Sequence, residues 1–153
     1  MTYLEFFMAY SGNYYPSNPA KYKGRVDRIV YRSSWERLLF AWCDECPDVK
    51  FWSSEETIVP YVCSTDNKVH RYFVDCVVEF HSGRKLLIEV KPKCQTVKPV
   101  MKKGKKQRTF LIEAFTYTKN VSKWNAAQKY AEKHNMSFQI WTEDTLRNLG
   151  IKV

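Results

Sequence analysis

One stretch of 25 residues, from 69 to 93, constrains the fold of this chain more than any other part; it reads VHRYFVDCVVEFHSGRKLLIEVKPK. Residues 73–80 and 85–91 each alternate apolar and polar side chains with the period of two that β-strands show. Gly83 lies between them, where a three-residue hairpin loop needs a residue with positive φ. The pattern therefore predicts an antiparallel β-hairpin with residues 81–83 as its loop.

The length of this loop sets which residues face each other across the hairpin. A three-residue loop pairs them as Val78 with Leu86, Cys76 with Ile88 and Val74 with Val90 on one face, and as Glu79 with Lys85, Val77 with Leu87 and Asp75 with Glu89 on the other. A two-residue loop would pair Cys76 with Glu89 and mix the faces, which a sheet with one buried face disfavours. The favoured register gives one wholly apolar face and sets two carboxylates side by side.

Asp75, Glu89 and Lys91 form a candidate metal site on the second face of the hairpin. Adjacent carboxylates repel each other unless a positive charge lies between them, and Mg²⁺ binds carboxylate oxygens while it keeps positions for water and phosphate. Lys91 follows Glu89 by two residues, so both side chains share a face. In this interpretation Lys91 orients the attacking water and stabilises charge on a phosphate. The alternative is a solvated cluster of charges without a metal.

The pattern of Val-Asp, thirteen residues and then Glu-Val-Lys resembles the core of the PD-(D/E)xK nuclease superfamily. The surrounding chain resembles two of its branches: the endonuclease subunit of certain cut-and-paste transposons and, over nearly the whole chain, the head-completion nucleases of large contractile-tailed phages. The segments that carry this resemblance, in order, are YRSSWER, VPY, HRYFVD, IEVKPK and FQIWTEDTL. The opening YSGNYYPSNPAKYKG favours the phage branch. Val74 departs from the pattern, because the superfamily name has proline there.

The resemblance implies a restriction-endonuclease-like core of the α/β (α+β) class, with a mixed β-sheet flanked by helices. The element order that we expect, one helix, three strands, a helix, a strand and a helix, fits such a core. It also implies hydrolysis of DNA phosphodiester bonds with Mg²⁺, for which Mn²⁺ substitutes. The phage branch further implies virion assembly, with head and neck proteins as partners. The alternatives are a transposon or restriction-type endonuclease subunit, and a non-enzymatic DNA-binding structural protein of the head–tail junction.

A helix is predicted to begin near Ser33 or Ser34, either of which can cap it. The apolar side chains that recur along it at helical spacing are Trp35, Leu38, Leu39, Trp42 and Cys46. Glu36 falls in the first turn, where the helix dipole alone favours a glutamate. In the resembled superfamily the glutamate at this helix start reaches the metal site. The resemblance therefore makes Glu36 a further metal ligand and catalytic residue.

Residues 91–108, here called the basic segment, carry eight Lys or Arg and no acidic residue, in a chain with a formal net charge of +9. This concentration of charge predicts a polyanion partner, which we take to be DNA, held by electrostatic and salt-sensitive contacts. Arg71 is added because the alternation along the first arm of the hairpin puts it on the Asp75 face. The predicted DNA-binding residues are Arg71, Lys93, Lys98, Lys102, Lys103, Lys105, Lys106 and Arg108. The alternative is a solvated loop without a role.

The length fits one domain, with residues 1–30 as an irregular N-terminal arm and residues 31–153 as the nuclease domain. The arm mixes tyrosine with lysine and arginine, a composition that suits nucleic-acid stacking and a protein interface equally well. A strand is expected near residues 57–62, and Pro60 argues that this strand lies at an edge.

In the second half of the chain, residues 109–118 are apolar enough for a short buried element, either helix or strand. Residues 120–135 are predicted to form the second long helix, with Asn135 as its stop. Residues 138–141 are predicted to be a strand. A final helix is expected to follow it and to run through Leu149.

The five cysteines are an odd number without the spacing of a disulfide framework. Cys43 and Cys46 could join Cys63 or Cys94 around zinc, but the pair lies inside a helical pattern, which favours reduced core cysteines. No apolar run is long enough to cross a bilayer, and the first residues lack a secretory signal. We therefore expect a cytoplasmic protein that has no membrane partner. For a phage protein this is the host-cell cytoplasm, and association with the virion is the alternative.

Overall fold

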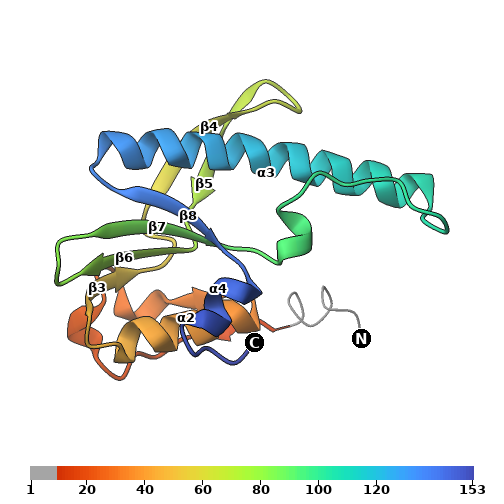
Figure 1. Ribbon diagram of the computed structural model, residues 1–153. Helices are drawn as coiled ribbons and strands as arrows, with labels where there is room; N and C mark the ends of the chain where they lie inside the picture. Colours follow the sequence, from red (N-terminus) through yellow and green to blue (C-terminus); the bar gives the residue numbers. More distant parts are fainter. Residues whose placement is uncertain (1–9) are drawn as a thin grey trace.

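A four-stranded mixed sheet forms the centre of this computed structural model, which describes residues 10–153. Its strands, in spatial order, are β3 (Val49–Ser53), β6 (Cys76–Phe80), β7 (Lys85–Val90) and β8 (Ser137–Trp141). β6 is antiparallel to both β3 and β7, and β8 runs parallel to β7. Helices α2 (Ser34–Glu45) and α4 (Glu143–Asn148) lie on one side of the sheet, and α3 (Gln107–Lys133) lies on the other (Figure 1). The predicted mixed sheet flanked by helices is confirmed.

The β6–β7 hairpin has the register predicted from its loop. Cys76 pairs with Ile88, Val77 with Leu87, Val78 with Leu86 and Glu79 with Lys85. Gly83 adopts the expected positive φ, at 90°. The apolar face that carries Val78 and Ile88 is buried in the main core, as predicted.

The first arm of the hairpin consists of two strands rather than the predicted continuous one. β5 (Lys68–Phe73) ends before β6 begins, and β5 pairs with β4 (Ile58–Cys63) in a separate two-stranded sheet. Val74 bonds to the chain just before β4, since its N–H donates to Thr57 O (3.0 Å) and its carbonyl accepts from Glu55 N (3.0 Å). The predicted pairing of Val74 with Val90 is therefore wrong, because the chain changes sheets at this residue.

The second face of β6 and β7 is also covered. Leu87 packs there in a second core cluster with Val74 and with Ala127 and Ala131 of α3. Glu89 lies on the same strand with only 4% of its surface exposed. The helix and the β4–β5 hairpin thus enclose the face on which the sequence places its carboxylates.

Helix α2 begins as predicted, with Ser33 as its cap. The Ser33 hydroxyl accepts a hydrogen bond from Glu36 N at 3.1 Å. Trp35 and Leu39 of the predicted apolar stripe are buried, together with Phe40. This packing fixes the first turn of α2, and therefore Glu36, against the sheet.

Residues 10–30 pack against the main core. β1 (Gly12–Asn13) pairs with β2 (Val30–Tyr31), and two short 3-10 turns, η1 (Pro19–Lys21) and η2 (Val26–Arg28), lie between them. Tyr22 and Ile29 are buried in the same cluster as the sheet and α2. Residues 1–9 lie outside the described part, and the boundary at residue 30 stays a prediction.

Helix α3 corrects the expectation for residues 109–118, because these residues and the predicted helix 120–135 form a single helix of 27 residues. The apolar side chains near its start are exposed rather than buried, with 57% of Leu111 and 58% of Phe115 accessible. Figure 1 gives the reason, since the first half of α3 extends past the sheet. An apolar stripe is buried only where another element faces it.

Five strands, rather than the expected three, lie between α2 and α3, because β3 was not predicted and the first arm of the hairpin is divided into β5 and β6. The elements after α3 agree with the sequence. Asn135, at φ 55°, follows the end of α3, and Thr142 caps α4 after β8. Pro60 lies in β4, which within the described residues pairs only with β5 and is thus an edge strand. Among residues 10–153, no helix has the length and apolar character that a membrane crossing requires.

Candidate functional site

Three elements bring three carboxylates together; we call Glu36, Asp75 and Glu89 the acidic site. Glu36 comes from the first turn of α2, Asp75 from the link between β5 and β6, and Glu89 from β7. Glu36 is 8% exposed and Glu89 4% exposed. The charges of Glu89 and Glu36 both act on Asp75, and that of Glu89 also acts on Glu36, so the three residues predicted from the sequence as metal ligands are neighbours in the fold.

Hydrogen bonds hold each carboxylate in place. Asp75 Oδ2 accepts from Val90 N at 2.8 Å, a bond that ties the residue to β7 just beyond the last ladder pair. Glu36 Oε2 accepts from Arg32 N at 2.9 Å. The hydroxyl of Tyr72 donates to Glu89 Oε2. One oxygen of each carboxylate is therefore held by a hydrogen bond, and the other oxygen of Glu89 is 3.3 Å from the Lys91 ammonium.

The acidic site carries an excess of buried negative charge. Burial, and then the charges of Glu89 and Glu36, raise the pKa of the Asp75 carboxyl well above its usual range. Burial also raises the pKa of Glu36, with Glu55 and Glu89 adding to the rise and the Arg32 N–H opposing it. A bound cation would relieve this repulsion.

The donor set of the acidic site fits a hard divalent cation. Mg²⁺ and Mn²⁺ prefer oxygen ligands, and one or two carboxylates plus waters and phosphate complete their shells. Glu36, Asp75 and Glu89 offer only carboxylate oxygens. The chemistry of these donors therefore agrees with the Mg²⁺ expected from the sequence.

Two lysines lie beside the acidic site. Lys91, predicted from the sequence, directly follows β7, and its Nζ is 3.3 Å from Glu89 Oε1. Lys123 comes from α3, where it is partly buried and its Nζ lies 5.7 Å from the centre of the Tyr72 ring. Burial lowers the pKa of Lys123, and the charge of Glu89 opposes this shift.

Tyr72 and Lys123 are site residues that the sequence pattern does not reveal. Burial, followed by the charges of Glu89 and Asp75, raises the pKa of Tyr72, so its phenol stays a hydrogen-bond donor. A tyrosine within a strand and a lysine within a helix carry no motif. The one signal for Lys123 is its position on the buried stripe of α3, between Asn120 and Ala127.

Arg71 does not share the face of Asp75, so this prediction is wrong. Tyr72 points toward Glu89, and neighbouring side chains on a strand point to opposite faces. Arg71 is exposed, with its guanidinium 5.6 Å from the centre of the Phe73 ring. The predicted alternation runs through Val74, where the chain in fact leaves one sheet for the other.

The basic segment begins at Lys91 and leads from β7 into α3. Lys93, in η3 (Lys93–Gln95), forms an ion pair with Asp144 at 2.9 Å, and Lys105 forms one with Glu113 at 2.7 Å. The other cations predicted to bind DNA are exposed; they are Lys98, Lys102, Lys103, Lys106 and Arg108.

A cavity of about 580 Å³ lies between the basic segment and α3. Lys91 lines one part of it, so the cavity adjoins the acidic site. Its other lining side chains include Lys98, Lys102, Lys105, Val97, Val100, Ile112 and Tyr117. The cavity thus combines positive charge with apolar and aromatic surface.

Cys43 of α2 and Cys46, which follows that helix as its C-cap, agree with reduced core cysteines. Cys43 is fully buried, with its Sγ 3.9 Å from that of Cys76. Among residues 10–153, one group of three or more His, Cys, Asp or Glu side chains has its ligand atoms all within 4.8 Å of one another, and it is formed by Cys63, Asp66 and His70; the three carboxylates of the acidic site do not meet this spacing. Cys43 and Cys46 are not part of it.

Comparison with known proteins agrees with this architecture. Residues 46–143 match the family described as TnsA-like endonuclease N terminal. The Head completion nuclease of Enterobacteria phage T4 is 43% identical over 148 residues, which cover 95% of this chain and 99% of that protein. No solved structure matches. The resemblance stated from the sequence is confirmed, as is the restriction-endonuclease-like fold, and the chain belongs to the TnsA-like endonuclease family.

Proposed function

We propose that this chain is a Mg²⁺-dependent deoxyribonuclease that acts in phage head completion, before the head joins the tail. The family supports nuclease chemistry, and the T4 relative, which is named a head completion nuclease, supports the stage of assembly. In this proposal the protein works in the host-cell cytoplasm, its substrate is DNA, and head or neck proteins are its partners.

The acidic site would hold the metal through Glu36, Asp75 and Glu89. When bound, Mg²⁺ or Mn²⁺ lowers the pKa of a water and polarises the phosphate. The Val90 N–H and the Tyr72 hydroxyl orient the Asp75 and Glu89 carboxylates, so these ligands are held before any metal arrives. Ligands that are held in this way already lie close to the positions that catalysis requires.

Lys91 contributes a positive charge beside the acidic site. Its Nζ is 3.3 Å from Glu89 and only 19% of its side chain is exposed, so it is held in a fixed position. Because it also lines the neighbouring cavity, it can contact a phosphate that enters from the basic segment. Charge stabilisation by a fixed cation in a site of low dielectric is a large term in catalysis.

Lys123 is proposed as a second positioning cation. It approaches the site from α3, with its ammonium near the Tyr72 ring, whereas Lys91 approaches from the end of β7. Burial lowers its pKa, and the negative charge of Glu89 acts against that effect. A lysine at this place offsets part of the carboxylate charge and leaves the site open toward the basic segment.

The DNA would follow the basic segment toward the acidic site. The exposed lysines give salt-sensitive backbone contacts, and the cavity beside Lys91 offers Tyr117 as an aromatic surface. Arg71 stays a proposed contact of the exposed β5 surface, outside the acidic site. Lys93 and Lys105 are expected to contribute less, because Asp144 and Glu113 already bind them.

The observation that carries this proposal is the meeting of three carboxylates and Lys91 from separate elements. We would incubate the purified chain with supercoiled plasmid and linear DNA in Mg²⁺, Mn²⁺ and EDTA lanes. Cleavage with either metal and none with EDTA is expected. Absence of metal-dependent cleavage, with DNA binding retained, would instead support a structural DNA-binding protein of the head–tail junction.

A further inference from the structure

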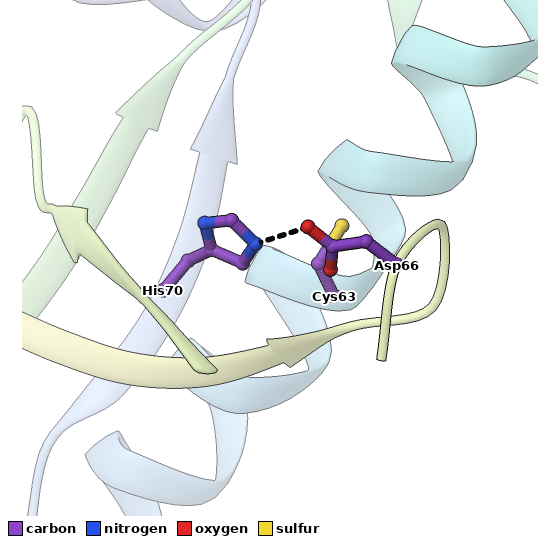
Figure 2. A group of neighbouring side chains, drawn as sticks. All are labelled: Cys63, Asp66 and His70. Carbon is purple, nitrogen blue, oxygen red and sulfur yellow. Dashed lines mark hydrogen bonds and ion pairs between the residues drawn. The ribbon is translucent and has the colours of Figure 1, made fainter. Parts of the chain in front are cut away.

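The β4–β5 hairpin carries a second group of metal-binding side chains, outside the acidic site. Cys63 ends β4, Asp66 lies in the turn and His70 lies in β5. Each offers one ligand atom, and these atoms all lie within 4.8 Å of one another. Figure 2 shows the His70 ring nitrogen directed at the Asp66 carboxylate, with the Cys63 sulfur beside that carboxylate.

The contacts of these side chains leave one donor atom of each facing the others. Asp66 Oδ1 accepts from Lys68 N at 3.0 Å, which turns Oδ2 toward His70 Nε2 at 2.7 Å. Cys63 is 1% exposed, and its Sγ lies 2.9 Å from the Thr65 hydroxyl. The thiol is therefore buried beneath the turn, and the carboxylate and imidazole lie nearer to solvent.

The turn that carries the ligands is held in place by backbone and helix contacts. Asn67 has φ 56° and donates its N–H to Cys63 O at 2.7 Å. Ser64 bonds to the Ser122 hydroxyl of α3, at 3.3 Å through its N–H and 3.0 Å through its own hydroxyl. The loop is thus closed on itself and attached to α3.

We propose that Cys63, Asp66 and His70 bind a Zn²⁺-type divalent ion, with water as the fourth ligand. Thiolate, imidazole and carboxylate are the usual donors of zinc sites, whereas Mg²⁺ avoids sulfur and nitrogen. Zinc–ligand bonds of about 2.0–2.3 Å place tetrahedral ligand atoms about 3.3–3.8 Å apart. The His70–Asp66 contact has to open by roughly 0.6 Å to meet these zinc distances, which a side-chain rotation supplies.

The bound ion would link the two strands of the β4–β5 hairpin at the turn between them. β5 also carries Tyr72, two residues after His70, and the Tyr72 hydroxyl bonds to Glu89. A metal at the turn therefore stabilises the strand that orients a carboxylate of the acidic site. Because binding favours the folded state, the ion should raise the thermal stability of the protein.

The test uses cobalt as a spectroscopic probe of the full chain after dialysis against EDTA. Co²⁺ bound to a thiolate gives a charge-transfer band in the near ultraviolet, which oxygen ligands alone do not give. The wild type should show this band at one Co²⁺ per chain. Cys63→Ser should lose it, and Cys94→Ser, which alters an exposed cysteine, should keep it.

Two further variants separate this site from the acidic site and from a folding defect. Asp75→Asn should keep the cobalt band, because its carboxylate belongs to the acidic site. His70→Gln changes a half-exposed side chain, so the variant should fold, and its Co²⁺ affinity should fall by about tenfold or more. Zn²⁺ should raise the Tm of the wild type by more than that of His70→Gln.

The proposal is overturned by a wild type without a thiolate band, or by a band that survives in Cys63→Ser. It is equally overturned if Zn²⁺ stabilises His70→Gln as much as the wild type. In those cases His70 and Asp66 form an ion pair only, and Cys63 is a core thiol. None of these outcomes depends on nuclease activity, so the proposed function is tested separately.

Discussion

The acidic site and the basic segment both concentrate charge of one sign, but they differ in burial. Glu36 and Glu89 are buried, and the repulsion between the carboxylates shows in the raised pKa of Asp75, to which burial contributes most. The basic segment has most of its cations in solvent. Water and salt screen exposed like charges, whereas buried like charges interact strongly.

Because of this difference in burial, the two regions need different partners to offset their charge. A buried cluster of like charges needs a compensating ion at one point, and three elements hold its donors around that point. An exposed run of like charges needs only a partner of opposite charge along its length. The first arrangement suits a metal, and the second suits the backbone of a nucleic acid.

The largest expected effect comes from removing charge at the acidic site. Under the proposed function, Asp75→Asn and Glu89→Gln should weaken metal binding, and Lys91→Ala should remove the cation proposed to contact the phosphate. Each should lower the initial cleavage rate by a factor on the order of 10² or more. Excess Mn²⁺ should rescue the two carboxylate variants better than Lys91→Ala, because metal concentration offsets weak binding but does not replace a missing cation.

The control for these variants is that they still bind DNA although they cleave it more slowly. All three should fold, as judged by circular dichroism, and should retain DNA affinity in EDTA. Cleavage at the wild-type rate by all three variants would remove the acidic site from the mechanism. Tyr72→Phe gives a graded comparison, since it keeps every charge and removes only the hydrogen bond to Glu89.

The sequence was sufficient to predict those parts of this site that depend on local pattern. Alternation and Gly83 give the register of β6 and β7, and Ser33 gives the start of α2 that presents Glu36. Lys91 follows from its spacing to Glu89. These features rest on neighbours in the chain, so propensity and periodicity determine them.

The features that the sequence did not reveal depend on contacts between distant elements. Alternation continues through Val74 in the sequence, so it does not indicate that the chain changes sheets there, and the face predicted for Arg71 is wrong for this reason. Lys123 reaches the site only because α3 crosses it. The exposed stripe near Leu111 resembles a core stripe, because periodicity does not report whether another element faces it.

The basic segment should respond to neutralisation in its salt dependence. Replacing Lys102, Lys103 and Lys106 together by alanine should reduce the slope of log affinity against log salt by about 0.9 for each phosphate that the protein no longer neutralises. Lys105→Ala is the matched control, because Lys105 is held by Glu113 at 2.7 Å and should change the slope less. Fluorescence anisotropy over a salt series measures both. An unchanged slope in the triple variant would identify the run as merely solvated.

A smaller effect is expected on the stability of the metal-free protein. Asp75→Asn removes one of three repelling charges and keeps an oxygen for the Val90 N–H, so it should raise the free energy of unfolding by about 1 kcal/mol. Mg²⁺ should cancel this advantage by stabilising the wild type more. Urea unfolding in EDTA and in Mg²⁺ measures it, with the exposed Glu132→Gln as control. If Asp75→Asn were less stable than the wild type in EDTA, the carboxylates would not repel one another in the folded protein.

The smallest effect is expected at the start of α3, where an apolar surface lies outside the core. Leu111→Gln and Phe115→Gln keep helix propensity and change side chains that are more than half exposed, so each should alter the free energy of unfolding by less than about 0.5 kcal/mol. Leu87→Ala, on a fully buried side chain, should cost about 2–5 kcal/mol in the same urea titration. Comparable destabilisation at all three positions would show that another part of the chain covers this half of α3. Near-neutral values at Leu111 and Phe115 would leave that surface free to line the path of the DNA, beside the exposed lysines of the basic segment.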